Sequence, residues 1–100
     1  MPKLHEFAHC RAGDKGDTSI LSLIAYRAAD YPILAQHVTA EAVKRHLRDI
    51  VRGDVRRYEL PELGALQFVC DNALGGGVTT SLGLDAHGKS LSYALLEMVI

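Results

Sequence analysis

VRRYELPELGALQFVCD, at residues 55–71, holds two strand-like runs separated by a turn. The first run, 55–60, alternates with a period of two, which is typical of a half-buried edge strand. Pro61 and Gly64 then force a turn, because proline fixes φ and glycine admits backbone conformations closed to other residues. Residues 65–71 form the second run, so this stretch predicts a hairpin or two adjacent strands.

The segment before the hairpin predicts a helix that begins after Thr39, an N-cap residue, and closes at Gly53. Its apolar residues recur at the spacing of one helix face: Val43, Leu47, Ile50 and Val51. Arginine and lysine side chains occupy its other faces and favour the C-terminal half of a helix.

Residues 18–26 permit two interpretations. The run is apolar on both alternating faces, as in a buried central strand. The spacing of Ile20, Leu23 and Ile24 also fits a helix capped by Asp17 or Thr18. We predict a strand and keep the helix as the alternative.

The other expected elements are a strand at 4–10, a charged turn at 13–17, a break at Tyr31-Pro32, a turn of helix at 34–37, an extended piece at 78–84, a turn at 85–88 and a closing helix at 89–98. One hundred residues make one domain, 1–100. Four or five strands and about two helices, without regular βαβ alternation, predict an α+β fold: an open antiparallel or mixed sheet with helices on one face.

Charge and hydropathy exclude several classes of partner. The net charge of −1 gives no basic footprint for nucleic acid or for an anionic membrane. No stretch approaches the ~20 apolar residues of a membrane-spanning helix, and the first residues are polar. We therefore expect a cytoplasmic protein with neither partner.

The cysteines and histidines do not predict a metal or a cofactor. Cys10 and Cys70 lie in apolar, strand-like segments without CxxC spacing, so we expect them to be buried as small hydrophobic residues. The five histidines show no metal-ligand spacing. His5 and His9 are expected on one face of the first strand, about 13 Å apart and too distant to chelate one ion.

Two glycine-punctuated segments are the candidate contact surface. The first contains Arg11, Gly13, Asp14, Lys15, Gly16 and Asp17, and the second contains Asn72, Gly75, Gly76, Gly77 and Thr79. The first supplies a guanidinium that can bind a carboxylate or phosphate, and the second supplies backbone N–H groups for an anion. Both follow strand-like runs, so we expect them to converge at one edge of the sheet. A solvated turn and a close packing of backbones remain the alternatives.

A proton-transfer role is the second interpretation of the first segment. His9, Asp14 and Lys15 are the candidate catalytic residues, since carboxylate, ammonium and imidazole groups serve as general acids and bases. A GxSxG elbow and a nucleotide-binding motif are both absent.

Several motifs together resemble the small ferredoxin-fold domain of the AtuA-like family, associated with acyclic terpene utilisation. They are AHCRAGDKGDT at 8–18, TAEAVK at 39–44, YELPELGAL at 58–66 and ALGGGVT at 73–79. The resemblance covers nearly the whole chain and implies a ferredoxin-like α+β sandwich. Ala12 and Asp17 stand where the family often has serine and asparagine, which changes the charge of the first segment. No catalytic residue carries over.

The resemblance also implies a setting in branched acyl-CoA or carboxylate catabolism, and two functions. The first is an accessory or small subunit that pairs with a larger AtuA-like protein and contributes its glycine-rich segments to a shared site. The alternative is an autonomous hydratase, lyase or isomerase.

A small open sheet leaves an edge strand or a face without cover, so we expect a homo-oligomer, most simply a dimer.

Overall fold

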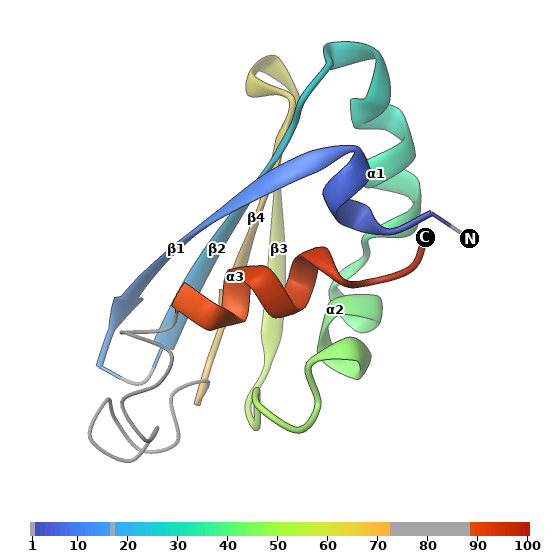
Figure 1. The fold of residues 1–100 in the computed structure, drawn as a ribbon. Coiled ribbons are helices and arrows are strands. Elements are labelled where there is room, and N and C mark those ends of the chain that lie inside the picture. Colours follow the sequence, from blue (N-terminus) through green and yellow to red (C-terminus); the bar gives the residue numbers. More distant parts are fainter. Residues whose placement is uncertain (1, 17, 73–88) are drawn as a thin grey trace.

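The sheet of this computed structural model, which describes residues 2–16, 18–72 and 89–100, has four antiparallel strands in the order β1-β2-β4-β3 (Figure 1). The strands are β1 (Ala8–Lys15), β2 (Thr18–Ala25), β3 (Val55–Leu60) and β4 (Ala65–Cys70). β4 lies between β2 and β3, so the chain crosses one strand position on its way from β2 to β3. The α+β fold expected from the sequence is confirmed.

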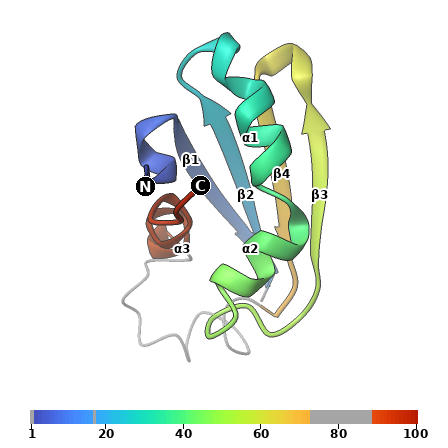
Figure 2. The same ribbon diagram turned by 90° about the vertical axis from the view of Figure 1, so that its right-hand side faces the viewer.

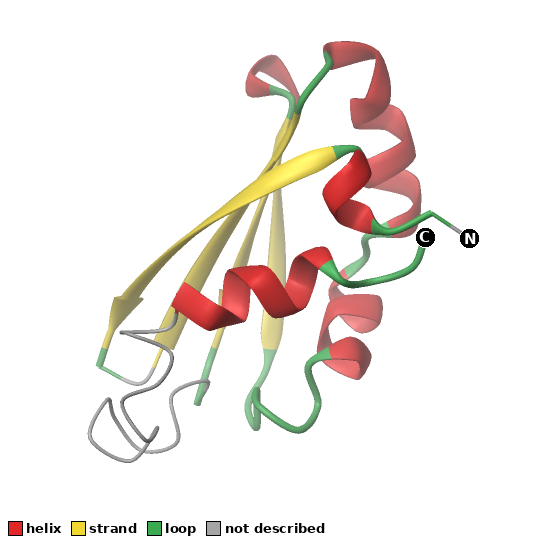
Figure 3. Ribbon diagram, viewed as in Figure 1, coloured by secondary structure: helices red, strands yellow, loops and turns green. Residues whose placement is uncertain are grey.

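Three helices cover one face of the sheet in the described part of the chain (Figures 2 and 3). They are α1 (Tyr31–His37), α2 (Ala40–His46) and α3 (Lys89–Leu96). α3 packs on β1, α1 on β4 and α2 on β3. The short 3-10 helices are η1 (Leu4–Glu6), η2 (Ala28–Asp30) and η3 (Pro61–Leu63).

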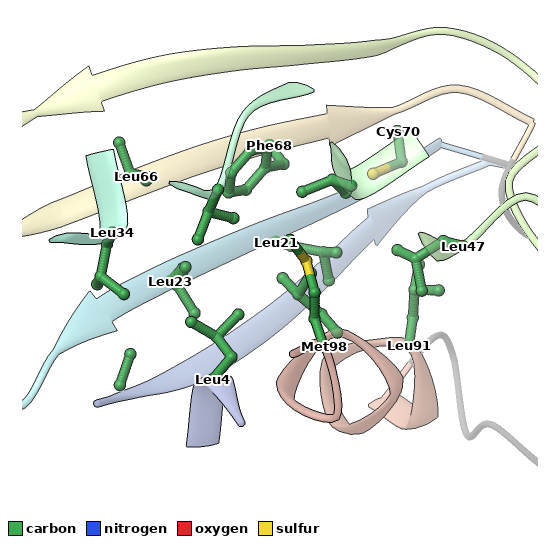
Figure 4. Close-up of a cluster of buried hydrophobic side chains, with 14 of the residues drawn as sticks. Leu4, Leu21, Leu23, Leu34, Leu47, Leu66, Phe68, Cys70, Leu91 and Met98 are labelled. Carbon is green, nitrogen blue, oxygen red and sulfur yellow. The ribbon is translucent and has the colours of Figure 1, made fainter. Parts of the chain in front are cut away.

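The core fills the space between the helices and the inner face of the sheet (Figure 4). Leu21, Leu23, Leu66 and Phe68 project from the two central strands and are fully buried. Leu34 and Leu95 meet them from the helix layer, also at 0% exposure. Each such side chain contributes about 2 kcal/mol by leaving water, so this single layer carries most of the stability.

β2 settles the ambiguity at residues 18–26 in favour of the strand. Its burial alternates strictly from Thr18 to Leu23, as a strand with one face on a core requires. It pairs with β1 on one side and β4 on the other, so it is the central strand that was expected. The β3–β4 hairpin is also confirmed, with η3 and the left-handed Gly64 (φ 61°) in its connection.

The charged turn expected at 13–17 is much shorter. β1 runs on to Lys15, which pairs with Thr18, so only residues 16 and 17 connect the two strands. Gly16 has φ 63°, the left-handed conformation that tight hairpin turns need. Asp17 lies outside the described residues.

The first strand also begins later than expected. Leu4–Glu6 is the 3-10 helix η1, and β1 starts at Ala8. Leu4 is completely buried, and its N–H donates to the carbonyl oxygen of Met98 at 2.8 Å. Residues 4–6 therefore pack against the C-terminal segment and do not extend the strand as expected. His5 and His9 do not share a strand.

The helix expected to close at Gly53 ends at His46. Thr39 is the N-cap as expected: its hydroxyl oxygen accepts the N–H of Ala42 at 3.0 Å. The chain then continues in turns, in which Leu47 and Val51 still reach the core. Gly53 instead lies against the end of β4, where a Cβ would meet the Asp71 carbonyl oxygen at 2.7 Å. This glycine permits a close approach of two backbones and does not terminate a helix.

Pro32 begins a helix where a break was expected. α1 starts at Tyr31, with the proline in its first turn, where a missing N–H leaves no hydrogen bond unmade. The closing helix expected at 89–98 is confirmed as α3, which ends slightly earlier, at Leu96. The expected extended piece at 78–84 and turn at 85–88 lie outside the described residues.

Candidate functional site

The face of the sheet turned away from the three helices, called the open face below, has no described element over it (Figure 1). Strand alternation and register assign its residues. They are His9, Arg11, Gly13 and Lys15 of β1, Thr18, Ile20, Ser22 and Ile24 of β2, Ala65, Gln67 and Val69 of β4, and Arg56, Tyr58 and Leu60 of β3.

The register arranges the open face in rows across the four strands. One row runs from Gly13 through Ile20 and Val69 to Arg56. The next runs through Arg11, Ser22, Gln67 and Tyr58. The face therefore combines half-buried aliphatic side chains on its central strands with basic side chains along both edge strands.

The two basic side chains at the hairpin end of β1 lack partners among the described residues. Arg11 and Lys15 are both exposed, and neither makes an ion pair or side-chain hydrogen bond there. Arg56, on the opposite edge strand, donates to Asp71 at 3.3 Å. Among the described residues, the positive charges of Arg11 and Lys15 on the β1 side of the open face thus have no partner.

Gly13 lies between Arg11 and Lys15 on the same strand face. A Cβ added there would meet nothing within 4 Å, and its φ is not in the left-handed region. The fold of the described chain therefore does not require a glycine at this position, although glycine weakens a strand by roughly 0.5–1 kcal/mol relative to alanine. The missing side chain leaves a low point in the surface between two cations.

His9 and Lys15, two of the three candidate catalytic residues, lie far apart on β1. His9 lies near the start of β1, where its ring packs against Tyr26 with centroids 5.5 Å apart. Lys15 is six residues further along the strand, about 20 Å away at ~3.3 Å per residue. Asp14 pairs with Ser19 at the hairpin end. A proton could not pass directly between His9 and Lys15 over this distance.

Asn72 lies at the same end of the sheet as the hairpin turn. Ser19 of β2 pairs with Cys70 of β4, so the residues after Cys70 run toward the level of Gly16. Asn72 has a positive φ of 52°, and its carbonyl oxygen accepts the N–H of Arg52 at 3.1 Å. The convergence expected for the two segments stays a prediction, because Gly75, Gly76, Gly77 and Thr79 lie outside the described residues.

The thiols are not nucleophiles at neutral pH. Burial raises the pKa of Cys10 to about 12, and burial likewise raises the pKa of Cys70 to about 11. Both are free thiols; Cys70 is completely buried, as expected of a small hydrophobic residue, whereas Cys10 is only partly buried. A thiol that keeps its proton at pH 7 neither attacks an electrophile nor ligates a metal readily.

In the ranges 2–16, 18–72 and 89–100, no three histidine, cysteine or acidic side chains come together in a way that could hold a metal ion. None of the helices in these ranges has the length and apolar character needed to cross a membrane.

Comparison with known proteins places the chain. The family model of the AtuA ferredoxin-like domain matches residues 2–100. The chain belongs to this family. Searches of curated proteins and of solved structures gave no match. The AtuA ferredoxin-like domain here therefore consists of a helix layer on one face of a four-stranded sheet, with the open face on the other.

Arg11, Gly13 and Lys15, predicted from the sequence as contact residues, lie on the open face, and their role in contact stays a prediction. The apolar part of this face, to which Ile20, Ile24 and Val69 belong, was not predicted from the sequence. The signal was present: the run 18–26 is apolar on both alternating faces, while the helices cover only one of them.

Proposed function

We propose that this AtuA ferredoxin-like domain is an accessory binding module that docks through its open face onto a larger AtuA-like protein. In branched acyl-CoA or carboxylate catabolism, it would complete a site on that partner with its hairpin end. The observation that supports the proposal is the open face itself, with aliphatic side chains on β2 and β4 and, on β1, two cations that have no partner among the described residues.

The size of the open face fits docking. Four strands at ~4.8 Å spacing and about six residues of length give a footprint of roughly 400 Å² before side-chain relief is counted. Exposed patches of this order on a small protein are commonly interaction sites. A standard interface buries about 800 Å² of accessible surface per partner, so a docked partner would also reach the hairpin turn.

Charge favours a partner with acidic side chains over a second copy of the chain on this face. A second copy would offer Arg11 and Lys15 one described carboxylate on the open face, that of Asp71. This carboxylate already accepts a hydrogen bond from Arg56 at 3.3 Å. Like charges brought together across an interface cost several kcal/mol, so the described residues favour a partner that brings carboxylates of its own.

The alternative, an autonomous hydratase, lyase or isomerase, has no such support. His9 lies about 20 Å from Lys15 along β1, at ~3.3 Å per residue, and the raised pKa values of the two thiols keep them protonated at neutral pH. We therefore place chemistry on the larger partner.

Co-purification tests the proposal. The chain would be co-expressed with a large AtuA-like protein encoded beside it that lacks this domain, and the complex captured through a tag on the larger protein. Arg11→Glu combined with Lys15→Glu should abolish capture, since it places carboxylates where the partner presents its own. Arg48→Glu is the matched control, because Arg48 is an exposed arginine of the segment after α2 and lies outside the open face.

Circular dichroism would establish that each variant folds. Failure of the parent chain to bind the larger protein would refute the function. Equal binding of parent and double variant would refute the open face as the docking surface.

A further inference from the structure

A groove of about 540 Å³ lies on the helix side of the molecule, away from the open face. One wall comes from the end of α1 and from α2, and the other from the C-terminal segment after α3. Small-molecule sites typically have volumes of ~300–1,000 Å³.

The α2 wall is built by helical spacing. Ala42, Arg45 and His46 stand at positions i, i+3 and i+4, which share one face of a helix. His37, the last residue of α1, adds a second imidazole to the same wall. This wall therefore carries the positive charge of Arg45 and two imidazole rings, those of His37 and His46.

The opposite wall is held in place by pairing with the N-terminal segment. Lys3 and Val99 form a β-bridge, and the N–H of Ile100 donates to the carbonyl oxygen of Pro2 at 3.1 Å. Met98 is 7% exposed and Val99 is 47% exposed. This wall supplies aliphatic surface on a fixed backbone.

Most polar groups of the groove already have partners. The Glu97 carboxylate accepts from the Lys3 ammonium at 2.6 Å. The His46 ring binds the carbonyl oxygen of Ala94, near the end of α3, at 2.7 Å. Arg45 and His37 make no side-chain hydrogen bond or ion pair among the described residues. Among the described residues, the Arg45 guanidinium thus has no partner, and the one carboxylate side chain that lines the groove, that of Glu97, is paired with Lys3.

We infer that this groove binds an aliphatic carboxylate, with its head group on Arg45 and its chain on Ala42 and Val99. Guanidinium and carboxylate form two parallel hydrogen bonds, which fixes the head group at one end of the groove. His37 donates a further hydrogen bond from the end of α1. The inference is independent of docking, because the groove and the open face lie on opposite sides of the sheet.

The test is a titration of the intact, ¹⁵N-labelled protein with octanoate, followed by heteronuclear NMR. Saturable shifts confined to residues of the two walls are expected, with a Kd of about 1 mM or below. Octanol and butyrate separate the two contributions: the first lacks the charge and the second most of the chain, so each should bind at least about tenfold more weakly.

Arg45→Gln should raise the Kd for octanoate about tenfold, whereas Arg48→Gln, an exposed arginine outside the groove, should leave it unchanged. Three results would overturn the inference: no saturation, shifts spread over the hydrophobic core, or equal affinity of the parent and Arg45→Gln proteins. His37→Gln gives a second, milder variant that reports on the same head group if Arg45→Gln does not fold.

Discussion

Arg57 joins the edge strand β3 to the helix layer, and its removal is the sharpest test of the fold. The residue faces inward on β3, and its side chain is 19% exposed. One guanidinium nitrogen donates to the carbonyl oxygens of Ala35 and Val38, at 2.8 and 3.0 Å. These carbonyls lie at the C-terminal end of α1, where the helix itself supplies no donors and positive charge is favourable.

The magnitude follows from these contacts. A buried hydrogen bond from a charged donor is worth about 1.5–3 kcal/mol net. Two such bonds share one nitrogen of a partly exposed side chain, so Arg57→Ala should lower the free energy of unfolding by about 3 kcal/mol. For a chain of this length the midpoint of thermal unfolding should fall by roughly 15 °C.

The ion pair that Arg57 makes with Glu59 at 2.7 Å contributes much less. Glu59 is 57% exposed, and exposed pairs are worth about 0–1 kcal/mol. Glu59→Gln should therefore cost about 0.5 kcal/mol and serves as the control for the carbonyl contacts.

Urea unfolding followed by far-UV circular dichroism measures both, since the chain has no tryptophan to report by fluorescence. Arg57→Lys keeps the positive charge but loses the several N–H donors of the guanidinium. Its free energy of unfolding should therefore lie between those of the parent and the alanine variant. The reasoning is refuted if Arg57→Ala stays within about 0.5 kcal/mol of the parent, or if Glu59→Gln costs as much as Arg57→Ala.

Three further outcomes are expected. Gly53→Ala should destabilise the protein by about 2 kcal/mol, because the new Cβ meets the backbone of Asp71. Gly13→Ala should be neutral or slightly stabilising, because a Cβ there meets nothing. Equal losses of the two variants in urea unfolding would contradict this. The raised pKa values of Cys10 and Cys70 mean that the unfolded chain loses these protons first, from a pKa of about 9. The free energy of unfolding should therefore be unaffected below pH 9 and fall as pH rises toward 11, by up to about 1 kcal/mol per pH unit for each thiol, and replacing both by alanine should flatten that slope. The chain should also self-associate, most simply as a dimer, because β3 is an edge strand of the described sheet; light scattering that gives a monomer at micromolar concentration would count against it.

Local sequence patterns correctly predicted several elements of the fold. The period-two run of β3, the turn at Pro61 and Gly64, and the N-cap at Thr39 all formed as expected. Each depends on neighbouring residues alone.

Tertiary contacts decided the elements that differed. The helical pattern after Thr39 extends to Val51, but Gly53 must reach the end of β4, so the chain leaves the helix after His46 to close that contact. The charged segment at 11–15 became a strand because β2 was available to pair with it. Neither partner is visible within a local window of sequence.

The open face was hidden for a different reason. An isoleucine on a central strand gives the same apolar pattern in the sequence whether it faces a helix layer or a partner protein. Ile20 and Ile24 could be assigned to the open face only after the position of the helices was known.

The pairing of the two terminal segments has a practical consequence for attachments to this domain. Lys3 bridges Val99, and both segments lie on the helix side of the sheet (Figure 1). A tag, a fluorophore or a fused protein joined at either end therefore leaves from the side opposite the open face. The same proximity allows residues 2 and 100 to be joined by a short linker and new ends to be opened at the Gly16 turn, giving a circular permutant whose attachments project from the hairpin end instead.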